Sequence, residues 1–507
     1  MSGKVYLVGA GPGDPGLITV RGLECLSRAD VVIYDYLASP VLLGNVREDA
    51  EIIYVGKKGS DHTLSQEDIN DLIVEKALKG GNVVRLKGGD PFIFGRGGEE
   101  AEKLSNQNIP FEIVPGVTSA IAGPAYAGIP LTHRKYTSTL AFVTGHENPD
   151  KGESSINWQS LATGIGTIVF LMGVKNLSNI ARRLMEAGKS PDTPVALVRW
   201  GTTPKQEVVT GILSNIVEYA KAAKIKSPAI IVVGEVVNLR DTMSWFENRP
   251  LWGKTIIITR ARAQASDLVA QLGGLGAQCL EFPTIKIEPV ADKTPLDRAI
   301  DRLKTYNWLI FTSVNGVDYF FKQLFEKGLD ARVLSHLQIA VIGPATQKKL
   351  LAFGIQTDLM PKNYQAESVI EAFAAFDIKG KQILLPRAKE ARPILPAELI
   401  KMGAMVDEIA VYQTCQVKNE VAHLMTRLQQ GSVDLITFTS SSTVRNFKNL
   451  LPVDSFDDLL EGVTIASIGP ITTQTAIELG FNVKITAKEF TIPGLCRAII
   501  DYCSADS

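Results

Sequence analysis

Short runs of apolar residues recur along the whole chain, separated by amphipathic segments and by turns rich in Gly and Pro. Apolar runs of about four to eight residues between turns predict buried strands. In the first half, such strands are expected at residues 5–9, 31–34, 83–86, 140–144, 167–172, 195–198 and 229–233. Helices are expected at 66–79 and 176–187. Alternating strands and helices predict an α/β architecture with mostly parallel sheets.

The second half contains an internal duplication. The segment that starts at Gly253 returns 127 positions later at Gly380, and at the same offset Ser313 corresponds to Ser440. Such ordered matches predict a pair of homologous α/β units that face each other across a cleft. A short polar stretch with Trp and Pro precedes the first repeat, which places a linker at residues 246–252.

Composition narrows the possible functions. A chain of 507 residues is too long for one ordinary core, so two to four domains are expected. A net charge of −1 without a Lys/Arg block argues against nucleic acid as a partner, and no apolar stretch is long enough to predict a membrane span. The five cysteines are scattered, which argues against a disulfide or metal framework and favours a cytoplasmic protein.

The glycine-rich turn at residues 11–16 follows the first expected strand and fits the Gly-x-Gly-x-x-Gly pattern. With Asp35 at the end of the next strand, this pattern alone would suggest a dinucleotide site. However, Pro12 and Pro15 lack the N–H groups with which such a loop holds a pyrophosphate. The dinucleotide interpretation is therefore disfavoured.

A longer series of motifs gives a different interpretation. The series comprises Leu7-Val-Gly-Ala-Gly-Pro-Gly-Asp-Pro-Gly16, Tyr34-Asp35, Gly56-Lys57-Lys58-Gly59, Arg85-Leu-Lys-Gly-Gly-Asp90-Pro-Phe-Ile93-Phe-Gly-Arg96-Gly-Gly-Glu-Glu, Pro115-Gly-Val-Thr118-Ser119-Ala, Thr-His133-Arg134, Leu171-Met172-Gly and Ser227-Pro-Ala-Ile-Ile-Val-Val-Gly-Glu235. From residue 3 to about 245 this sequence resembles the uroporphyrinogen-III C-methyltransferases. The resemblance implies the tetrapyrrole-methylase fold, with a domain at 1–245 made of two α/β subdomains at about 1–116 and 117–245.

The resemblance also implies S-adenosylmethionine as the methyl donor and a set of residues that bind it. That set is Pro12, Gly88, Gly89, Asp90, Ile93, Thr118, Ser119, Met172 and Gly201. Asp35 would be the proton acceptor and Lys57 the proton donor of the reaction. From side-chain type alone, Asp35 could instead cap a turn, Lys57 could be a solvated cation, and Met172 could fill a core.

A substrate with eight carboxylates calls for Arg and Lys side chains that converge on it. Arg96 and Arg134 lie within the motifs and are candidates for this role, although each could equally be a surface cation. The family usually forms dimers, so the resemblance allows a homodimer through the methylase half.

The duplicated half, residues 253–507, resembles the uroporphyrinogen-III synthases. Its signatures are Thr312-Ser-Val-Asn-Gly316, Ile342-Gly-Pro, Leu384-Leu-Pro-Arg387-Ala, Val411-Tyr412-Gln-Thr414, Phe438-Thr-Ser440-Ser-Ser-Thr-Val and Ile468-Gly-Pro-Ile-Thr472-Thr473. The resemblance implies two flavodoxin-like α/β domains, one at about 288–409 and the other at 253–287 plus 410–507. It also implies Tyr412 as the acid that assists loss of a hydroxyl, with Ser440 and Thr472 binding carboxylates. Hydroxyl residues after strands are turn caps at least as often.

The two halves fit one reaction sequence. The second would cyclise hydroxymethylbilane to uroporphyrinogen III, and the first would methylate uroporphyrinogen III twice to precorrin-2. Two alternatives remain open. The duplicated half could be a non-catalytic, flavodoxin-like binding module, or the methylase could act on another precorrin.

Overall fold

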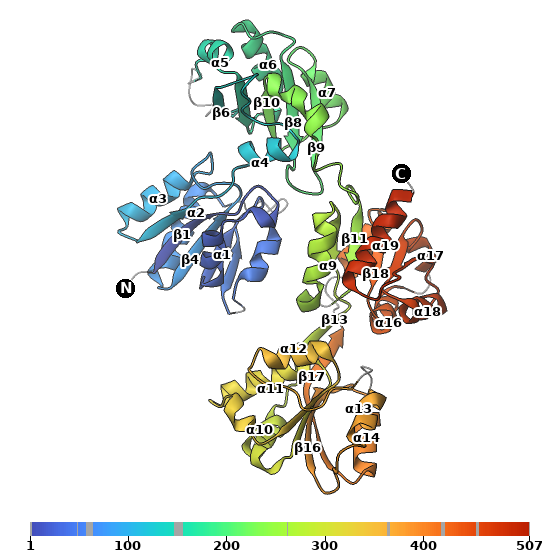
Figure 1. The fold of residues 1–507 in the computed structure, drawn as a ribbon. Helices are drawn as coiled ribbons and strands as arrows, with labels where there is room; N and C mark the ends of the chain where they lie inside the picture. The colour runs from blue at the N-terminus through green and yellow to red at the C-terminus, as the bar shows by residue number, and fades with distance from the viewer. Residues whose placement is uncertain are drawn as a thin grey trace. The chain divides into compact units, whose positions relative to one another are not determined.

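The computed structural model describes residues 3–47, 49–56, 64–146, 156–260, 262–361, 366–416, 421–452 and 456–505. The chain divides into two compact units, Met1–Lys254 with Leu272–Gln278, and Thr255–Gln271 with Cys279–Ser507. Four five-stranded sheets carry the fold (Figure 1). Helices alternate with the strands throughout, so the expected α/β architecture is confirmed.

The first sheet has the order β3-β2-β4-β1-β5, and all its strand pairs are parallel. Its strands are β1 (Lys4–Gly9), β2 (Val31–Tyr34), β3 (Glu51–Tyr54), β4 (Asn82–Lys87) and β5 (Phe111–Val114). Its helices are α1 (Val20–Ser27), α2 (Gln66–Leu78) and α3 (Gly97–Asn106). Because β1 is followed by β2 on one side and β4 by β5 on the other, the order of the strands reverses near β1 and β4. In such sheets ligands bind outside the carboxyl ends of the strands at the reversal.

Helix α2 shows how the sequence sets a boundary. Ser65 caps it by accepting a hydrogen bond from the Asp68 N–H, and the Asp68 carboxylate accepts one from the Ser65 N–H in return. This reciprocal cap satisfies two N–H groups that would otherwise be orphaned at the first turn. Both helices expected from the sequence, and all seven expected strands, are present within one residue of their predicted ends.

The second sheet has the order β6-β7-β10-β8-β9. Its strands are β6 (Leu140–Thr144), β7 (Thr167–Leu171), β8 (Pro194–Arg199), β9 (Glu207–Ile212) and β10 (Ala229–Val233). Its helices are α4 (Ser119–Tyr126), α5 (Trp158–Gly164), α6 (Leu177–Glu186), α7 (Ile216–Ala222) and α8 (Arg240–Met243). Only β6 and β7 pair in parallel, and the other three pairs are antiparallel. The expectation of mostly parallel pairing was wrong for this sheet, because buried strands have the same apolar composition in either orientation.

The third sheet has the order β12-β11-β18-β19-β20. Its strands are β11 (Thr255–Ile258), β12 (Gln278–Glu281), β18 (Leu435–Phe438), β19 (Thr464–Ser467) and β20 (Val483–Thr486). The accompanying helices are α9 (Arg262–Gly274), α15 (Val421–Gln429), α16 (Ser441–Leu450), α17 (Phe456–Leu459), α18 (Pro470–Glu478) and α19 (Ile492–Ala505). Numbered within this sheet, the strand order is 2-1-3-4-5, which is the order of flavodoxin.

The fourth sheet has the order β13-β17-β16-β14-β15, with only the edge strand β13 antiparallel. Its strands are β13 (Ile285–Pro289), β14 (Trp308–Phe311), β15 (Gln338–Val341), β16 (Gln382–Ala388) and β17 (Met405–Gln416). Its helices are α10 (Thr294–Asp301), α11 (Val314–Glu326), α12 (Pro344–Leu351), α13 (Ala366–Phe373) and α14 (Ile394–Lys401). The four parallel strands again follow the flavodoxin order, so the flavodoxin-like expectation for the second half is confirmed.

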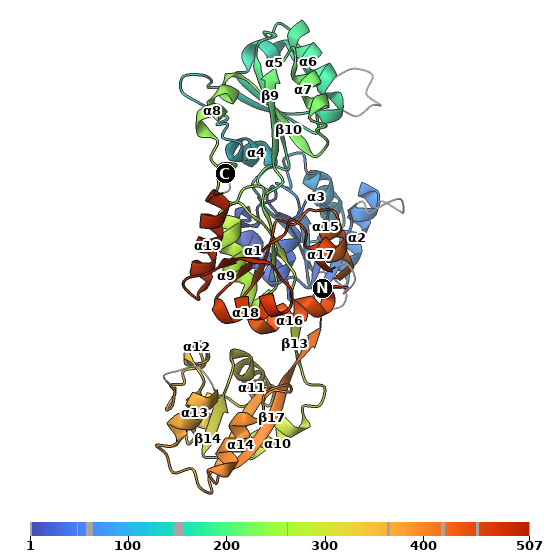
Figure 2. The same cartoon turned by 90° about the vertical axis from the view of Figure 1, so that its right-hand side faces the viewer.

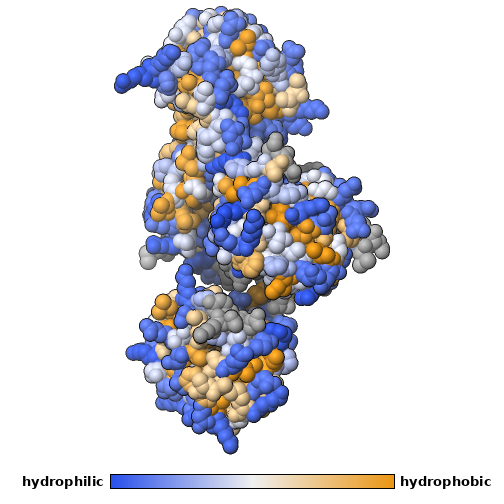
Figure 3. Space-filling view, turned by 45° about the vertical axis from the view of Figure 1, so that its right-hand side comes forward, coloured by the Kyte–Doolittle hydropathy of each residue, from blue (hydrophilic) through white to orange (hydrophobic). Residues whose placement is uncertain are grey.

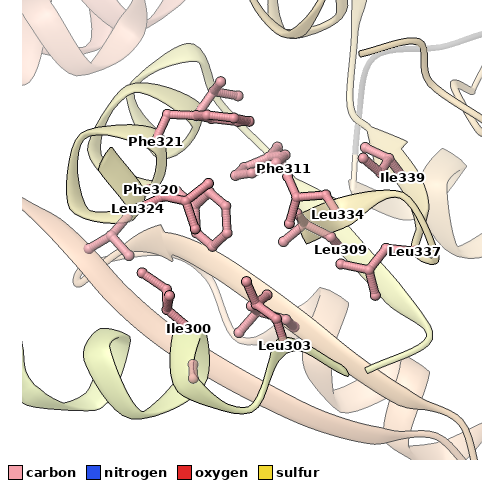
Figure 4. Close-up of a cluster of buried hydrophobic side chains, with 14 of the residues drawn as sticks. Ile300, Leu303, Leu309, Phe311, Phe320, Phe321, Leu324, Leu334, Leu337 and Ile339 are labelled. Atoms are coloured by element: carbon pink, nitrogen blue, oxygen red, sulfur yellow. The ribbon is translucent and has the colours of Figure 1, made fainter. Parts of the chain in front are cut away.

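Each face of the fourth sheet has its own core. On one face Phe311, Phe320 and Phe321 pack with aliphatic side chains from α10, α11 and the strands (Figure 4). On the other face Trp308 packs against Phe373 and Phe376. The strands are therefore buried on both sides, which explains their almost continuous apolar sequence.

The described surface is mixed in polarity. On the face that Figure 3 shows, hydrophobic residues lie in separate small groups among hydrophilic ones. Within the described ranges, no helix combines the length and the apolar character that crossing a membrane would need. Figure 2 gives the view at right angles to Figure 1.

Candidate functional site

Glycine-rich turns from two strands meet at the carboxyl edge of the first sheet. Gly11, after β1, and Gly89, after β4, exchange two backbone hydrogen bonds of 3.2 and 2.7 Å. A Cβ added to Gly9 would lie 2.5 Å from the Cα of Gly116, so only glycine lets these backbones touch. The Cβ position of Gly89 meets nothing closer than Thr118 at 3.7 Å, but its φ of +71° favours glycine.

The Asp90 carboxylate holds this edge together from inside. Its Oδ1 accepts hydrogen bonds from the N–H groups of Phe92 and Ile93 at 2.8 and 3.0 Å. Its Oδ2 accepts one from the Gly116 N–H at 2.9 Å. Both oxygens are therefore engaged by backbone, and the side chain fixes the loops after β4 and β5 relative to each other.

A turn from the second sheet reaches the glycine-rich turn after β1. The Asp14 N–H donates to Thr202 Oγ1 at 3.0 Å, and Tyr126 Oη donates to Asp14 Oδ2 at 2.8 Å. Burial, and then this hydrogen bond, raise the pKa of Tyr126 to about 12. These contacts place the residues around Gly201 beside the turn that contains Pro12, so predicted donor residues from the loops of two sheets come together.

The remaining predicted donor residues lie at the same edge or next to helix α4. Thr118 is buried and caps α4, whose first residue is Ser119. Leu171 pairs with Ile230, which in turn packs against Gly123 of α4, and Met172 follows Leu171 directly. Met172 is 51% exposed and has a left-handed φ of 58°, so it does not fill a core. Ile93 and Leu37 are exposed as well, which gives the site apolar side chains open to a ligand.

Asp35 follows β2 at this edge. Its side chain is 26% exposed, and its Oδ2 accepts a hydrogen bond of 2.9 Å from Nη2 of the buried Arg85. Its Oδ1 accepts a hydrogen bond of 3.1 Å from the Leu37 N–H. Both oxygens are thereby held, while the carboxylate stays open to solvent. Lys57, the predicted proton donor, lies outside the described residues.

The two predicted substrate-binding arginines are exposed. Arg96 sits at the N-cap of α3 with a left-handed φ of 59° and forms an ion pair with Glu99. Arg134 lies on the turn between α4 and β6. Among the described residues no hydrogen bond or ion pair joins either arginine to Asp35, so a substrate-binding role stays a prediction for both.

Tyr412 lies on β17 and is 8% exposed. Its hydroxyl is 3.0 Å from Oγ of Ser313, which caps α11, and its ring stacks on Tyr319. The phenol thus stands at the carboxyl edge of the fourth sheet, beside a helix N-terminus. A hydroxyl so placed can give a proton to a leaving group or bind an anion.

Ser440 and Thr472 follow neighbouring strands of the third sheet. Ser440 ends the loop after β18 and caps α16 by accepting a hydrogen bond from the Thr443 N–H. Thr472 lies in the first turn of α18, after β19, and is buried. These two residues share one sheet edge, whereas Tyr412 belongs to the other sheet.

Two groups of residues escaped the sequence reasoning. The motif that contains Arg85 and Glu100 assigns neither a role, although a charged residue such as Arg85 within a buried strand is a usable signal. Arg387 is the second-last residue of β16 and is buried, and its Nη1 lies 3.3 Å from a Glu408 carboxylate oxygen. Burial lowers the pKa of its guanidinium. Arg387 matches Arg260 in the duplication, and that correspondence could have drawn attention to both.

Two family models match the chain. The model described as "Tetrapyrrole (Corrin/Porphyrin) Methylases" covers residues 4–217, and the model described as "Uroporphyrinogen-III synthase HemD" covers residues 266–497. Together with the two flavodoxin-like sheets and the glycine-rich edge, these matches define a two-part enzyme of tetrapyrrole biosynthesis.

Curated relatives agree with this division. The chain is 40% identical over 501 residues to the "Porphyrin biosynthesis protein HemD" of Ruminiclostridium josui, covering 98% of each chain. It is 56% identical over 236 residues to the "Uroporphyrinogen-III C-methyltransferase" of Priestia megaterium, covering 46% of this chain and 99% of the relative. Among solved structures, a Thermus thermophilus uroporphyrin-III C-methyl transferase complexed with S-adenyl homocysteine is 40% identical, covering 47% of this chain and 100% of that one, with a TM-score of 0.41. The chain belongs to the uroporphyrinogen-III C-methyltransferase family through its first half and to the uroporphyrinogen-III synthase family through its second.

Proposed function

We propose that this chain cyclises hydroxymethylbilane to uroporphyrinogen III and methylates that product twice, from S-adenosylmethionine, to precorrin-2. The observation that carries the methylase part is the meeting of the predicted donor turns and Asp35 at the carboxyl edge of one sheet. The similarity of the chain to a porphyrin biosynthesis protein over 98% of its length supports the pairing of both activities.

The residues at this edge suit a sulfonium donor. S-adenosylmethionine supplies a methyl group that leaves its sulfur for a pyrrole carbon. The open Cβ position of Gly89 lets a ligand approach the backbone, and exposed Met172 and Ile93 offer apolar contact. Asp90 is already saturated by backbone N–H groups, so we propose that it acts by holding these loops rather than by contacting the donor with a free oxygen.

We propose that Asp35 accepts a proton from the methylated macrocycle. Methyl transfer to a pyrrole carbon leaves an excess positive charge, which is relieved when a proton leaves a neighbouring carbon. A carboxylate held in one orientation at the open edge can take that proton. We assign the largest share of the rate to positioning of donor and acceptor within one pocket.

In the second half, the structure suits a cyclisation that loses water. Tyr412 is hydrogen-bonded to Ser313 and can protonate the departing hydroxyl, while the helix N-termini after β14 and β18 can bind substrate carboxylates. We propose that Ser440 and Thr472 take part in that binding. We also propose that the second half divides into one domain at about 288–409 and another at 253–287 plus 410–507.

The test uses the purified full chain, with isomers and methylated products separated by chromatography and identified by mass. With hydroxymethylbilane alone we expect the type III isomer, and with S-adenosylmethionine added we expect a dimethylated product. An isomer ratio equal to that of spontaneous closure would leave the second half as a binding module. Supplied uroporphyrinogen III tests the methylase separately, and no methylation of it would refute that half of the proposal.

A further inference from the structure

A buried ionic network lies directly behind Asp35. Arg85, on β4, is 3% exposed and donates from Nη2 to Asp35 Oδ2 at 2.9 Å. From Nε it donates to Glu100 Oε1 at 3.2 Å, and from Nη1 to the Leu86 carbonyl at 3.0 Å. One guanidinium thus joins the open edge of the sheet to a carboxylate in the interior.

Glu100 forms the interior end of this network. Its side chain has no exposed surface, and its Oε1 also accepts hydrogen bonds from Lys87 Nζ at 2.7 Å and from Gln66 Nε2 at 3.3 Å. Two cations, Arg85 and Lys87, therefore balance two carboxylates, Asp35 and Glu100. Burial, with the neighbouring guanidinium next, lowers the pKa of Lys87.

A network of this kind is a poor way to stabilise a fold. Desolvation of buried ions costs as much as their pairing returns, and apolar residues of similar volume are often equally stable or more so. Three further charged groups, Arg85, Lys87 and Glu100, behind the predicted proton acceptor therefore indicate a role in the reaction. Strands β2 and β4 pair with Ile33 opposite Arg85, and Asp35 lies two residues beyond Ile33. The Arg85 side chain therefore reaches Asp35 from the neighbouring strand.

We infer that Arg85 is a positioning residue for methyl transfer, which fixes the plane of the Asp35 carboxylate and is itself held by Glu100. This inference rests on the proposed function of the first half. With Oδ2 held by Arg85 and Oδ1 by the Leu37 N–H, the carboxylate cannot turn about its Cβ–Cγ bond without losing a hydrogen bond. Its remaining lone pairs stay directed at one place, as a proton acceptor requires.

The test is a double-mutant cycle on the full chain with R85K, D35N and the double variant. Methylation of supplied uroporphyrinogen III gives kcat and KM, and equilibrium dialysis with S-adenosylmethionine gives the donor Kd. Lysine keeps the charge of Arg85 but cannot hold Asp35 and Glu100 together. Because small misplacements at a reacting centre cost up to about 100-fold in rate, we expect R85K to lower kcat about 10- to 100-fold.

Three results separate positioning from a structural role. KM and the donor Kd of R85K should stay within about threefold of the values of the unaltered chain. In the D35N background, R85K should lower kcat by less than about threefold, since the effects of coupled residues are not additive. R182K, at an exposed ion pair on α6, serves as the matched control and should leave methylation unchanged. Isomer formation reports that the second half of each variant is intact, and the donor Kd reports the same for the first half.

Equal losses from R85K in both backgrounds would overturn the inference and leave the proposed function standing. Absence of methylation by the unaltered chain would overturn both. Should R85K lose donor binding altogether, E100Q replaces it in the cycle. E100Q keeps the Arg85–Asp35 pair but weakens the hydrogen bond between Arg85 and residue 100. We therefore expect kcat to fall several-fold, and we expect this fall to disappear in the D35N background. An unchanged kcat would count against the inference.

Discussion

The hydrogen bond from Tyr126 to Asp14 joins the glycine-rich turn after β1 to helix α4, and its contribution can be estimated. The pKa of Tyr126 rises from 10.0 to about 12, first through burial and then through this bond. Two pKa units correspond to about 2.7 kcal/mol, which is an upper limit for this bond because burial is the larger cause of the rise and the ring is partly exposed. A hydrogen bond to a charged group contributes about 1.5–3 kcal/mol, so we expect Y126F to destabilise the first unit by about 1–2 kcal/mol.

The pH dependence has a definite sign. Because the folded pKa lies above the unfolded value, the contribution is fully present below about pH 10 and is lost as pH rises toward 12. At pH 11 about 1.4 kcal/mol of the upper limit would be gone. Phenylalanine has no proton to lose, so the difference between the two proteins should shrink between pH 8 and pH 11. Other titrating groups are common to both proteins and cancel in the comparison.

Urea unfolding followed by tryptophan fluorescence suits this measurement. Trp158, Trp200, Trp245 and Trp252 lie in the first unit, and only Trp308 lies in the second. Trp245 also packs against Tyr126, with ring centroids 5.1 Å apart. Equal stability of Y126F and the unaltered chain at pH 8, or a difference that does not change up to pH 11, would refute the assignment of this bond.

Three further predictions concern single positions. G9A should destabilise the first unit by about 1–3 kcal/mol in thermal unfolding, because its Cβ would lie 2.5 Å from Gly116 Cα, whereas G98A, with open space around it, should not. Y412F should slow type III isomer formation at least about tenfold, while methylation of supplied uroporphyrinogen III is unchanged. Equal rates of isomer formation by Y412F and the unaltered chain would contradict a proton-donor role. F320A removes a fully buried ring and should lower the free energy of unfolding of the second unit by about 3–5 kcal/mol. A decrease below about 1 kcal/mol would show that the core is not tightly packed around Phe320.

The apolar pattern predicted seven of the ten strands that the structure describes in the first half, and two of its helices, because burial on both faces makes a strand almost entirely apolar. Residues 31–34 and 229–233 coincide with β2 and β10. The same pattern carries no direction, so the antiparallel pairing of β10 with β7 and β8 could not be foreseen. Strand β9 was missed for a related reason: its residues are only partly buried or exposed, and its apolar run is short.

The glycine motifs predicted the candidate site more completely than side-chain chemistry did. Gly11 and Gly89 meet as their motif positions imply, since turns after parallel strands share one edge. The role of Asp90 could not be derived, because three backbone N–H groups from two loops satisfy it and only the fold brings those loops together. Arg85 was overlooked for the same reason, since its partners lie 50 and 15 positions away along the chain.

The duplication and the sheets divide the second half differently, and the reason lies in strand pairing. The third sheet pairs β11 of the first repeat with β18 of the second, and the fourth pairs β14 of the first with β16 of the second. Neither repeat can complete a sheet alone, because its apolar strands would lack neighbours on one side. Each sheet consequently receives one Arg and one capping Ser from opposite repeats, Arg260 with Ser440 and Arg387 with Ser313. A duplicated sequence has thus produced two sheet edges with the same pair of residue types, which is a suitable arrangement for a substrate that carries carboxylates along its whole length.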